Sequence, residues 1–216
     1  SNYTEKNRVN LILANPPFGG IVANNNENNF PQNYRTKESA DLFLVLMVHL
    51  LKNGGRAGIV LPDGSLTGDG VKQRVREKLL TDCNLHTIIR LPNSVFQPYA
   101  TVATNLLFFT KGEPTKEIWY YEHRLPEGQK AYNKTKPIQL KEFDPIKKWW
   151  NKREESELCW KVDIRAIKNR NYDLDIKNPT RQEEEIIHSS AELMEMLDKS
   201  FSKSRDLLKQ LKATAK

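Results

Sequence analysis

An apolar run that stops at two prolines is the feature that most limits how this chain can fold. Residues 9–14 (VNLILA) are mostly apolar without regular alternation, which is typical of a strand buried on both faces in a parallel α/β sheet. Pro16 and Pro17 lack a backbone N–H and have a fixed φ, so they end the strand in a stiff turn. We therefore expect Asn15 at the carboxyl end of a buried strand, where open α/β sheets bind their ligands.

The turn after this strand forms the candidate catalytic site. Its residues are Asn15, Pro16, Pro17 and Phe18. The Asn15 side chain and the Pro16 carbonyl offer two hydrogen-bond acceptors, which suit an exocyclic amino group with its two N–H donors. The ring of Phe18 suits stacking on a nucleobase that has been pulled out of its helix. The alternative is a plain strand end with a packed phenylalanine, but the strand before the motif and the ring after it favour the functional interpretation.

A strand–helix–strand pattern surrounds this turn. Residues 21–37 are rich in asparagine and predict a mobile loop, which is either a lid over the site or a disordered insertion. Ser39 is the predicted cap of a buried helix that ends at Asn53–Gly55. Residues 56–61 predict the next strand. Such a unit implies a right-handed crossover between parallel strands, so this strand and Asn15 end at the same edge of the sheet.

The rest of the chain predicts more strands, then helices. Further strands are expected at residues 85–91, 105–109 and 118–121, a short helix at 140–151, and irregular structure at 158–178. Residues 64–70 predict a flexible connector. The helix expected at 71–80 has charged side chains that we expect to face solvent, with a DNA-backbone contact as the minor alternative: Lys72, Arg74, Arg76 and Lys78. A long amphipathic helix is predicted from Thr180 to about Leu211, which docks to a partner subunit or packs back on its own domain.

Several ordered blocks give the chain a resemblance to a known family. The NPPF sequence of Asn15–Phe18 resembles the catalytic motif of amino-group methyltransferases that use S-adenosylmethionine. Five later blocks are similar to segments of the modification subunits of type I restriction–modification systems: residues 54–64, 96–99, 104–111, 172–174 and 177–179. Glutamine methyltransferases that act on release factors carry a related NPPY motif but lack those later blocks. The resemblance covers roughly residues 8–180.

The resemblance implies an α/β fold, namely the C-terminal half of a Rossmann-like S-adenosylmethionine-dependent methyltransferase sheet followed by a C-terminal helical region. We expect a partial catalytic domain at residues 1–122, an irregular or helical extension at 123–179 and a long amphipathic helix at 180–216. The strand at 9–14 is then expected to have an open edge, because the first half of the sheet would precede it.

The activity that the resemblance implies is site-specific methylation of adenine N6 in DNA, on a flipped base, with Asn15, Pro16, Pro17 and Phe18 as the catalytic residues. Asn15 and Asp41 are expected to contact S-adenosylmethionine in part. The chain has no convincing glycine-rich cofactor turn, so the main cofactor site is expected outside it. The isolated chain is therefore expected to show little or no methyl transfer.

The partners implied by the resemblance are double-stranded DNA and the specificity and restriction subunits of a type I complex. A homodimer through the open sheet edge or the C-terminal helix is a further expectation. The net charge of +7 favours a polyanionic partner. The scattered histidines and the distant Cys83 and Cys159 predict no metal site and a reduced, cytoplasmic protein, and no apolar run is long enough for a membrane span. Two alternatives remain open: a non-catalytic assembly module that docks a specificity subunit, and a protein glutamine N5-methyltransferase.

Overall fold

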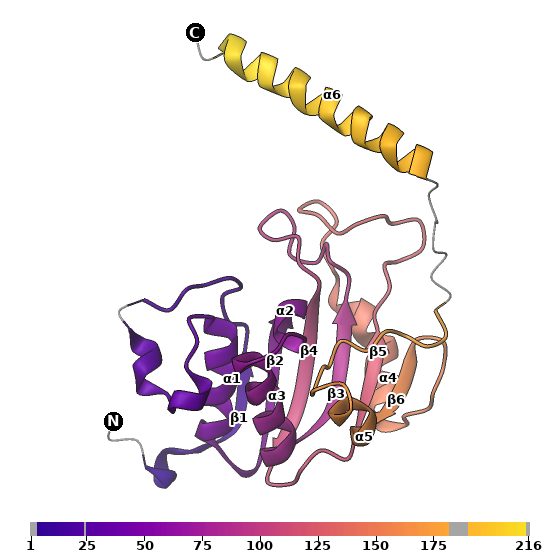
Figure 1. Ribbon diagram of the computed structural model, residues 1–216. Helices are drawn as coiled ribbons and strands as arrows, with labels where there is room; N and C mark the ends of the chain where they lie inside the picture. Colours follow the sequence, from indigo (N-terminus) through magenta and orange to yellow (C-terminus); the bar gives the residue numbers. More distant parts are fainter. Residues whose placement is uncertain (1–3, 24, 182–189, 215–216) are drawn as a thin grey trace. The chain divides into compact units, whose positions relative to one another are not determined.

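The computed structural model describes residues 4–23, 25–181 and 190–214 (Figure 1). The chain forms two compact units, Ser1–Arg181 and Gln182–Lys216. The second unit contains helix α6 (Ser190–Thr214). The first turns of the helix predicted from Thr180 fall on residues 182–189, which lie outside the described residues. None of the described helices is both long and apolar enough to cross a membrane.

The first unit is built on a six-stranded mixed sheet with the strand order β1-β2-β4-β3-β5-β6. The strands are β1 (Val9–Ala14), β2 (Leu51–Pro62), β3 (Cys83–Leu91), β4 (Thr104–Lys111), β5 (Glu117–Glu122) and β6 (Cys159–Asp163). The α-helices are α1 (Ser39–Leu50), α2 (Asp63–Leu66), α3 (Val71–Asp82), α4 (Asp144–Asn151) and α5 (Ile164–Lys168). Short 3-10 helices are η1 (Glu5–Asn7), η2 (Asn26–Asn29), η3 (Gln32–Tyr34) and η4 (Leu140–Phe143).

The strand directions bring several loops to one edge of the sheet. β1 pairs with β2 in parallel, as does β3 with β5, while β4 is antiparallel to both of its neighbours. The carboxyl ends of β1, β2, β3 and β5 therefore lie at one edge, which we call the carboxyl edge, and β4 begins there. This confirms the predicted α/β class and the predicted parallel pairing of the strand before Asn15 with the next strand.

The two faces of the sheet are covered unequally (Figure 1). Helices α1, α3 and α5 cover one face, over a core that includes buried residues of β2, β3, β4 and β5. Helix α4 covers the other face over β3 and β5 through Ile146 and the two tryptophans Trp149 and Trp150. No described helix of the first unit covers that second face at β1, where Leu11 and Leu13 are 57% and 74% exposed. β1 is an edge strand, as expected, but the prediction that it is buried on both faces is wrong, because α1 covers one face alone.

Several predicted boundaries are also wrong. Helix α1 ends at Leu50 and β2 starts at once, so Asn53–Gly55 lies inside a strand, where the pairing with β1 shifts register. The connector predicted at residues 64–70 begins inside helix α2, which is held in place because Leu66 is buried in the core. The segment expected to be irregular contains β6, which is the far edge strand of the sheet, and helix α5. The described part of residues 21–37 contains η2 and η3, and the Val22 N–H donates to the Lys37 carbonyl at 2.9 Å; the mobility expected of this loop stays a prediction.

The charged face predicted for helix α3 is wrong at Arg76. This side chain is 2% exposed and inserts among backbone carbonyls. Its guanidinium donates to the carbonyls of Tyr172 at 2.6 Å, Thr67 at 2.7 Å and Gly68 at 2.5 Å. Arg76 therefore joins the turn after α2 to the segment that follows α5, and burial lowers the pKa of its guanidinium.

Candidate active site at the carboxyl edge

The candidate catalytic amide lies where the sequence predicts it. Asn15 is the first residue after β1, and its neighbour Ala14 pairs with Ile59 of β2. The Asn15 residue is exposed, and its side chain makes no hydrogen bond with any residue that the structure describes. An amide held at a strand end without an internal partner keeps its oxygen and both hydrogens available to a ligand.

The turn after Asn15 is tied to the start of helix α1. Pro16 is buried, while the carbonyl of Pro17 accepts a hydrogen bond from the Ser39 hydroxyl at 3.0 Å. The Ser39 N–H donates to the Gly20 carbonyl, also at 3.0 Å. The prediction that Ser39 caps the helix is therefore wrong, because Glu38 is in the cap position. A Cβ atom on Gly20 would lie 2.7 Å from the Ser39 hydroxyl, so this close approach requires glycine.

The aromatic residue of the motif contacts a second aromatic residue that sequence reasoning did not select. The rings of Phe18 and Phe96 meet edge to face, with centroids 5.3 Å apart and planes at 87°. Phe96 belongs to the loop of residues 92–103 that joins β3 to β4. The sequence could have suggested this contact through the predicted topology, because parallel strands place the loop after β3 at the same edge as Asn15.

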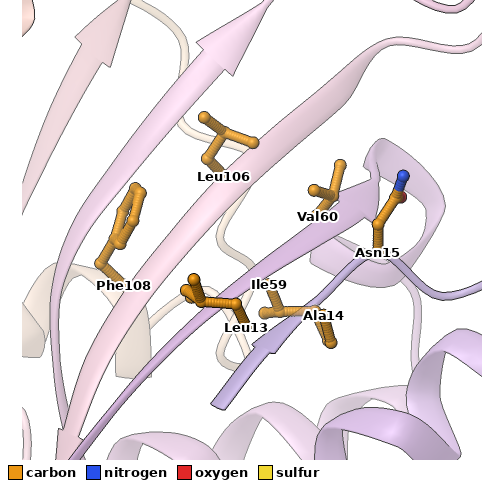
Figure 2. Close-up of a pocket in the computed structure, with 8 residues that line it drawn as sticks. Leu13, Ala14, Asn15, Ile59, Val60, Leu106 and Phe108 are labelled. Carbon is orange, nitrogen blue, oxygen red and sulfur yellow. The ribbon is translucent and has the colours of Figure 1, made fainter. Parts of the chain in front are cut away.

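A cavity of about 360 Å³ runs along the uncovered face of the sheet beside the motif (Figure 2). Its lining is Leu13, Ala14, Asn15, Gly58, Ile59, Val60, Leu106 and Phe108. Asn15 is the polar side chain in this otherwise apolar lining, and Figure 2 shows it at the end of β1. An apolar cavity with a polar group at one end is the usual composition of a ligand pocket.

Asp41, unlike Asn15, has a charged partner within the chain. Its side chain is 2% exposed and pairs with the Lys72 amine at 3.3 Å; the same amine lies 3.5 Å from Glu38. The residues after it differ in exposure, with Leu42 buried and Phe43 40% exposed. The contact predicted between Asp41 and the cofactor stays a prediction.

A second cavity, of about 500 Å³, opens at the carboxyl edge between β2, β3 and β5. The Asp63 carboxylate, directly after β2, accepts a hydrogen bond from the Asn105 amide at 2.6 Å. The Arg90 guanidinium lies 2.5 Å from Asp175 and 3.8 Å from Asp63. This network was not evident from the sequence, and it joins the ends of β2 and β3 and the start of β4 to Asp175. Because its charges are paired internally, its evident role is to hold the edge together.

The catalytic candidates themselves provide hydrogen-bond acceptors and a ring, and none of the four side chains titrates. Within the described ranges, no cluster of three or more histidine, cysteine, aspartate or glutamate residues could hold a metal ion. The geometry therefore suits a reaction in which a polar substrate group is oriented by fixed acceptors.

Comparison with known families shows which family the chain belongs to. The model of the N-6 DNA methylase family matches residues 1–187. The chain belongs to the N-6 DNA methylase family. This N-6 DNA methylase chain is 48% identical over 212 residues to the EcoEI methylase subunit of a type I restriction enzyme from Escherichia coli. That match covers 95% of the chain and 43% of the relative.

Solved structures give the same result. A modification subunit of a putative type I restriction enzyme from Vibrio vulnificus shares 43% identity at a TM-score of 0.77, covering 83% of this chain and 40% of that one. A chain from a study of complex assembly in a type I restriction–modification system shares 35% identity at a TM-score of 0.77, covering 96% and 45%. These matches confirm the resemblance to type I modification subunits, and the chain spans less than half the length of these relatives.

Proposed function

We propose that this N-6 DNA methylase chain supplies the target-base corner of a site-specific DNA adenine-N6 methyltransferase, the modification subunit of a type I restriction–modification system. The observation that carries the proposal is the exposed amide of Asn15, which has no hydrogen bond to any described residue and lies on a stiff turn whose Phe18 ring contacts Phe96. The family match supports DNA as the substrate, and the type I relatives support the site-specific system.

The corner acts by orienting an amino group. The lone pair of adenine N6 is delocalised into the ring, which makes this nitrogen a poor nucleophile. The Asn15 amide oxygen and the Pro16 carbonyl accept its two hydrogens and favour a pyramidal nitrogen with a usable lone pair. Phe18 stacks on the flipped base, and the edge of Phe96 keeps the Phe18 ring in place. Directed acceptors and positioning, without a strong base, account for the rate.

S-adenosylmethionine is the proposed methyl donor, and when bound it supplies a methyl group on a positively charged sulfur. The described residues fit it in part. Asn15 can contact it, but Asp41 is buried against Lys72, and the position that a Cβ would take at Gly20 is filled by Ser39 and leaves no cradle. We propose that residues outside these 216 complete the cofactor site, as expected for relatives more than twice as long.

The proposed partners are double-stranded DNA and the specificity and restriction subunits, and the proposed location is the cytoplasm.

Helix α6 has large apolar side chains that are about half exposed or more: Leu193 49%, Met194 63%, Leu197 51%, Phe201 63% and Leu208 52%. Such a helix needs a partner surface to be stable in water. We assign α6 to docking on the specificity subunit, and the open edge of β1 is the competing surface for a homodimer.

The docking proposal predicts that Leu193→Glu combined with Leu197→Glu abolishes co-elution with the specificity subunit in size-exclusion chromatography. The charges remove the apolar stripe, while Glu is a good helix former. Lys203→Glu combined with Lys209→Glu, exposed positions on the same helix, is the control and retains binding. Unimpaired co-elution of the leucine variant would assign docking to another surface.

The proposed chemistry is tested by product analysis. The complete modification subunit that contains this chain, assembled with its specificity subunit, is incubated with isotopically labelled S-adenosylmethionine and either DNA or a release factor. Mass spectrometry of the digested products is expected to show N6-methyladenine. Labelled glutamine would support the protein methyltransferase instead, and no label in either substrate would favour a non-catalytic assembly module, for which the exposed face of α6 is the specific observation.

A further inference from the structure

A loop at the carboxyl edge extends beyond the sheet next to the catalytic corner. Residues 123–139, which we call the basic loop, join β5 to η4. The His123 N–H donates to the Arg90 carbonyl at 2.9 Å, and the Tyr132 N–H donates to the Ser94 hydroxyl at 3.0 Å. The basic loop therefore lies against the loop of residues 92–103, and Figure 1 shows both reaching past the same edge.

The basic loop is anchored by one buried aromatic residue. Tyr132 is 1% exposed; its hydroxyl donates to the Glu142 carboxylate at 2.5 Å and lies 3.0 Å from the His123 ring nitrogen Nε2. Burial and the bond to Glu142 raise the Tyr132 pKa, so the hydroxyl stays a donor at neutral pH. The Asn133 side chain accepts from the N–H groups of Thr135 and Lys136 at 3.0 and 2.9 Å. These bonds give the loop a fixed shape.

The loop presents unpaired positive charge. The basic loop contains Arg124, Lys130, Lys134 and Lys136 and a single carboxylate, Glu127. All three lysines are exposed, and none forms an ion pair with a residue in the described part of the chain. The arginines of the neighbouring cavity differ, since Arg181 lies 2.6 Å from Glu122 and Arg124 lies 3.5 Å from Glu157. Among the described positive side chains of the basic loop, Arg124 is therefore paired, and the three lysines are not.

A short series of contacts joins these lysines to the catalytic turn. The Lys134 amine lies 5.7 Å from the centroid of the Tyr99 ring. The Tyr99 N–H donates to the Phe96 carbonyl at 2.9 Å, and the Phe96 ring meets Phe18. A duplex whose base enters the corner at Asn15 would thus bring its backbone to the surface on which the lysines stand.

We propose that Lys130, Lys134 and Lys136 bind backbone phosphates of double-stranded DNA beside the target base, and that Tyr132 positions them. The inference rests on the proposed function, because it takes DNA as the substrate. Phosphate contacts from lysines position a duplex without reading its sequence. The basic loop then fixes the position of the duplex relative to Asn15, and other contacts recognise the DNA sequence.

The test is the salt dependence of DNA binding, measured by fluorescence anisotropy with a labelled 30-base-pair duplex and the 216-residue chain. Lys130→Gln, Lys134→Gln and Lys136→Gln are combined in one variant. The control combines Lys52→Gln, Lys116→Gln and Lys168→Gln, exposed residues near the opposite edge, at the amino end of β2, before β5 and in α5. Both variants lose the same charge, so non-specific attraction falls equally.

The loop variant is expected to lower the slope of log Kd against log salt by about 2.7 and the affinity at 0.1 M salt by at least about tenfold, since each phosphate contact contributes a slope of about 0.9. The control keeps the wild-type slope within about 1. The effect is the same on duplexes of unrelated sequence. Equal slopes for the two variants, or no binding by the wild-type chain at 0.05 M salt, would overturn the inference.

The outcome is separable from failure of the proposed chemistry. DNA binding by the chain requires no methyl transfer, so a loss of slope confined to the loop variant supports the inference even if the complete enzyme methylates another substrate. Conversely, N6-methyladenine formation with unchanged slopes would leave the proposed function standing and overturn the role of the basic loop. Circular dichroism spectra that superimpose on wild type verify that the exposed substitutions leave the fold intact.

Discussion

The two ends of the sheet are built differently. At the β5 end, Ile118 and Tyr120 are fully buried on one face, and on the other face Tyr121 packs against Trp149 of α4 with ring centroids 5.2 Å apart. At the β1 end, helix α1 covers one face and Leu13 on the other face is 74% exposed. The same kind of apolar strand is thus a core element at one end and a surface element at the other.

The difference separates stability from function. The doubly covered end holds the fold together, because buried apolar area is the main source of folding free energy. The singly covered end carries Asn15 and the adjoining cavity. Its apolar side chains are less buried, and the same exposure leaves the cavity open to a ligand. The structure therefore predicts that substitutions at the two ends differ in kind: stability is lost at one end and activity at the other.

The largest expected effect comes from one chemical change made in the doubly covered part of the sheet and again in its singly covered part. Leu85→Ala in β3 removes a fully buried side chain and is expected to cost about 2–5 kcal/mol of unfolding free energy. Leu13→Ala in β1 is expected to cost less than about 1 kcal/mol, because the side chain is mostly exposed. Urea unfolding followed by circular dichroism measures both. Equal losses would show that the comparison is wrong.

A smaller, pH-dependent effect belongs to the covered end. Burial beneath Trp150, with the nearby Arg153, lowers the pKa of His86 from 6.5 to about 4. Between these values the unfolded chain takes up the proton first, so stability falls as pH falls from about 6.5 towards 4. With allowance for partial exposure, the contribution is roughly 1–2 kcal/mol.

His86→Gln is expected to flatten the fall in unfolding free energy between pH 7 and pH 4.5, and His49→Gln, at an exposed position of α1, serves as the control. The readout is the difference in slope between variant and wild type, because carboxylates titrate in all three proteins. A His86 variant with the wild-type slope would show that this ring is solvated.

The smallest effect is expected at a glycine on the open face. A Cβ on Gly58 would meet the ends of Leu13 and Phe108 at 3.0 and 3.2 Å, side chains that can move towards solvent. Gly58→Ala should therefore cost under about 1 kcal/mol. At Gly55 the Cβ would meet the Lys52 carbonyl at 2.8 Å, so Gly55→Ala should cost more. The reverse order in thermal melts would mean that the open face is packed.

The sequence was sufficient for the features that local patterns encode. The proline stop placed Asn15 at a strand end, and the strand–helix–strand pattern placed that end at the carboxyl edge, as observed. Burial of β1 could not be inferred, because an apolar run does not reveal whether both of its sides are covered. The motif and the family blocks could be recognised from the sequence because the residues of each are adjacent in the chain.

Features that depend on distant segments were missed. Arg76 looked like a solvated helix residue, and nothing nearby in the chain indicates that carbonyls from Thr67 and Tyr172 converge on it. Phe96 was noticed within a family block but was not joined to Phe18, since their contact depends on the sheet order β1-β2-β4-β3. The sequence did not single out the lysines of the basic loop, because their position follows from two contacts with the loop of residues 92–103. These are the Tyr132 N–H with Ser94 and the Lys134 amine with the Tyr99 ring.

The central claim is that the free amide of Asn15 orients the adenine amino group. The most direct measurement is kcat for DNA methylation by the complete modification enzyme carrying Asn15→Ala, with Asn10→Ala, at an exposed asparagine within β1, as the matched control. We predict that kcat falls by about 10²–10³ for Asn15→Ala while the Kd for DNA changes less than about twofold. A kcat for Asn15→Ala within about threefold of the Asn10→Ala control would contradict the account.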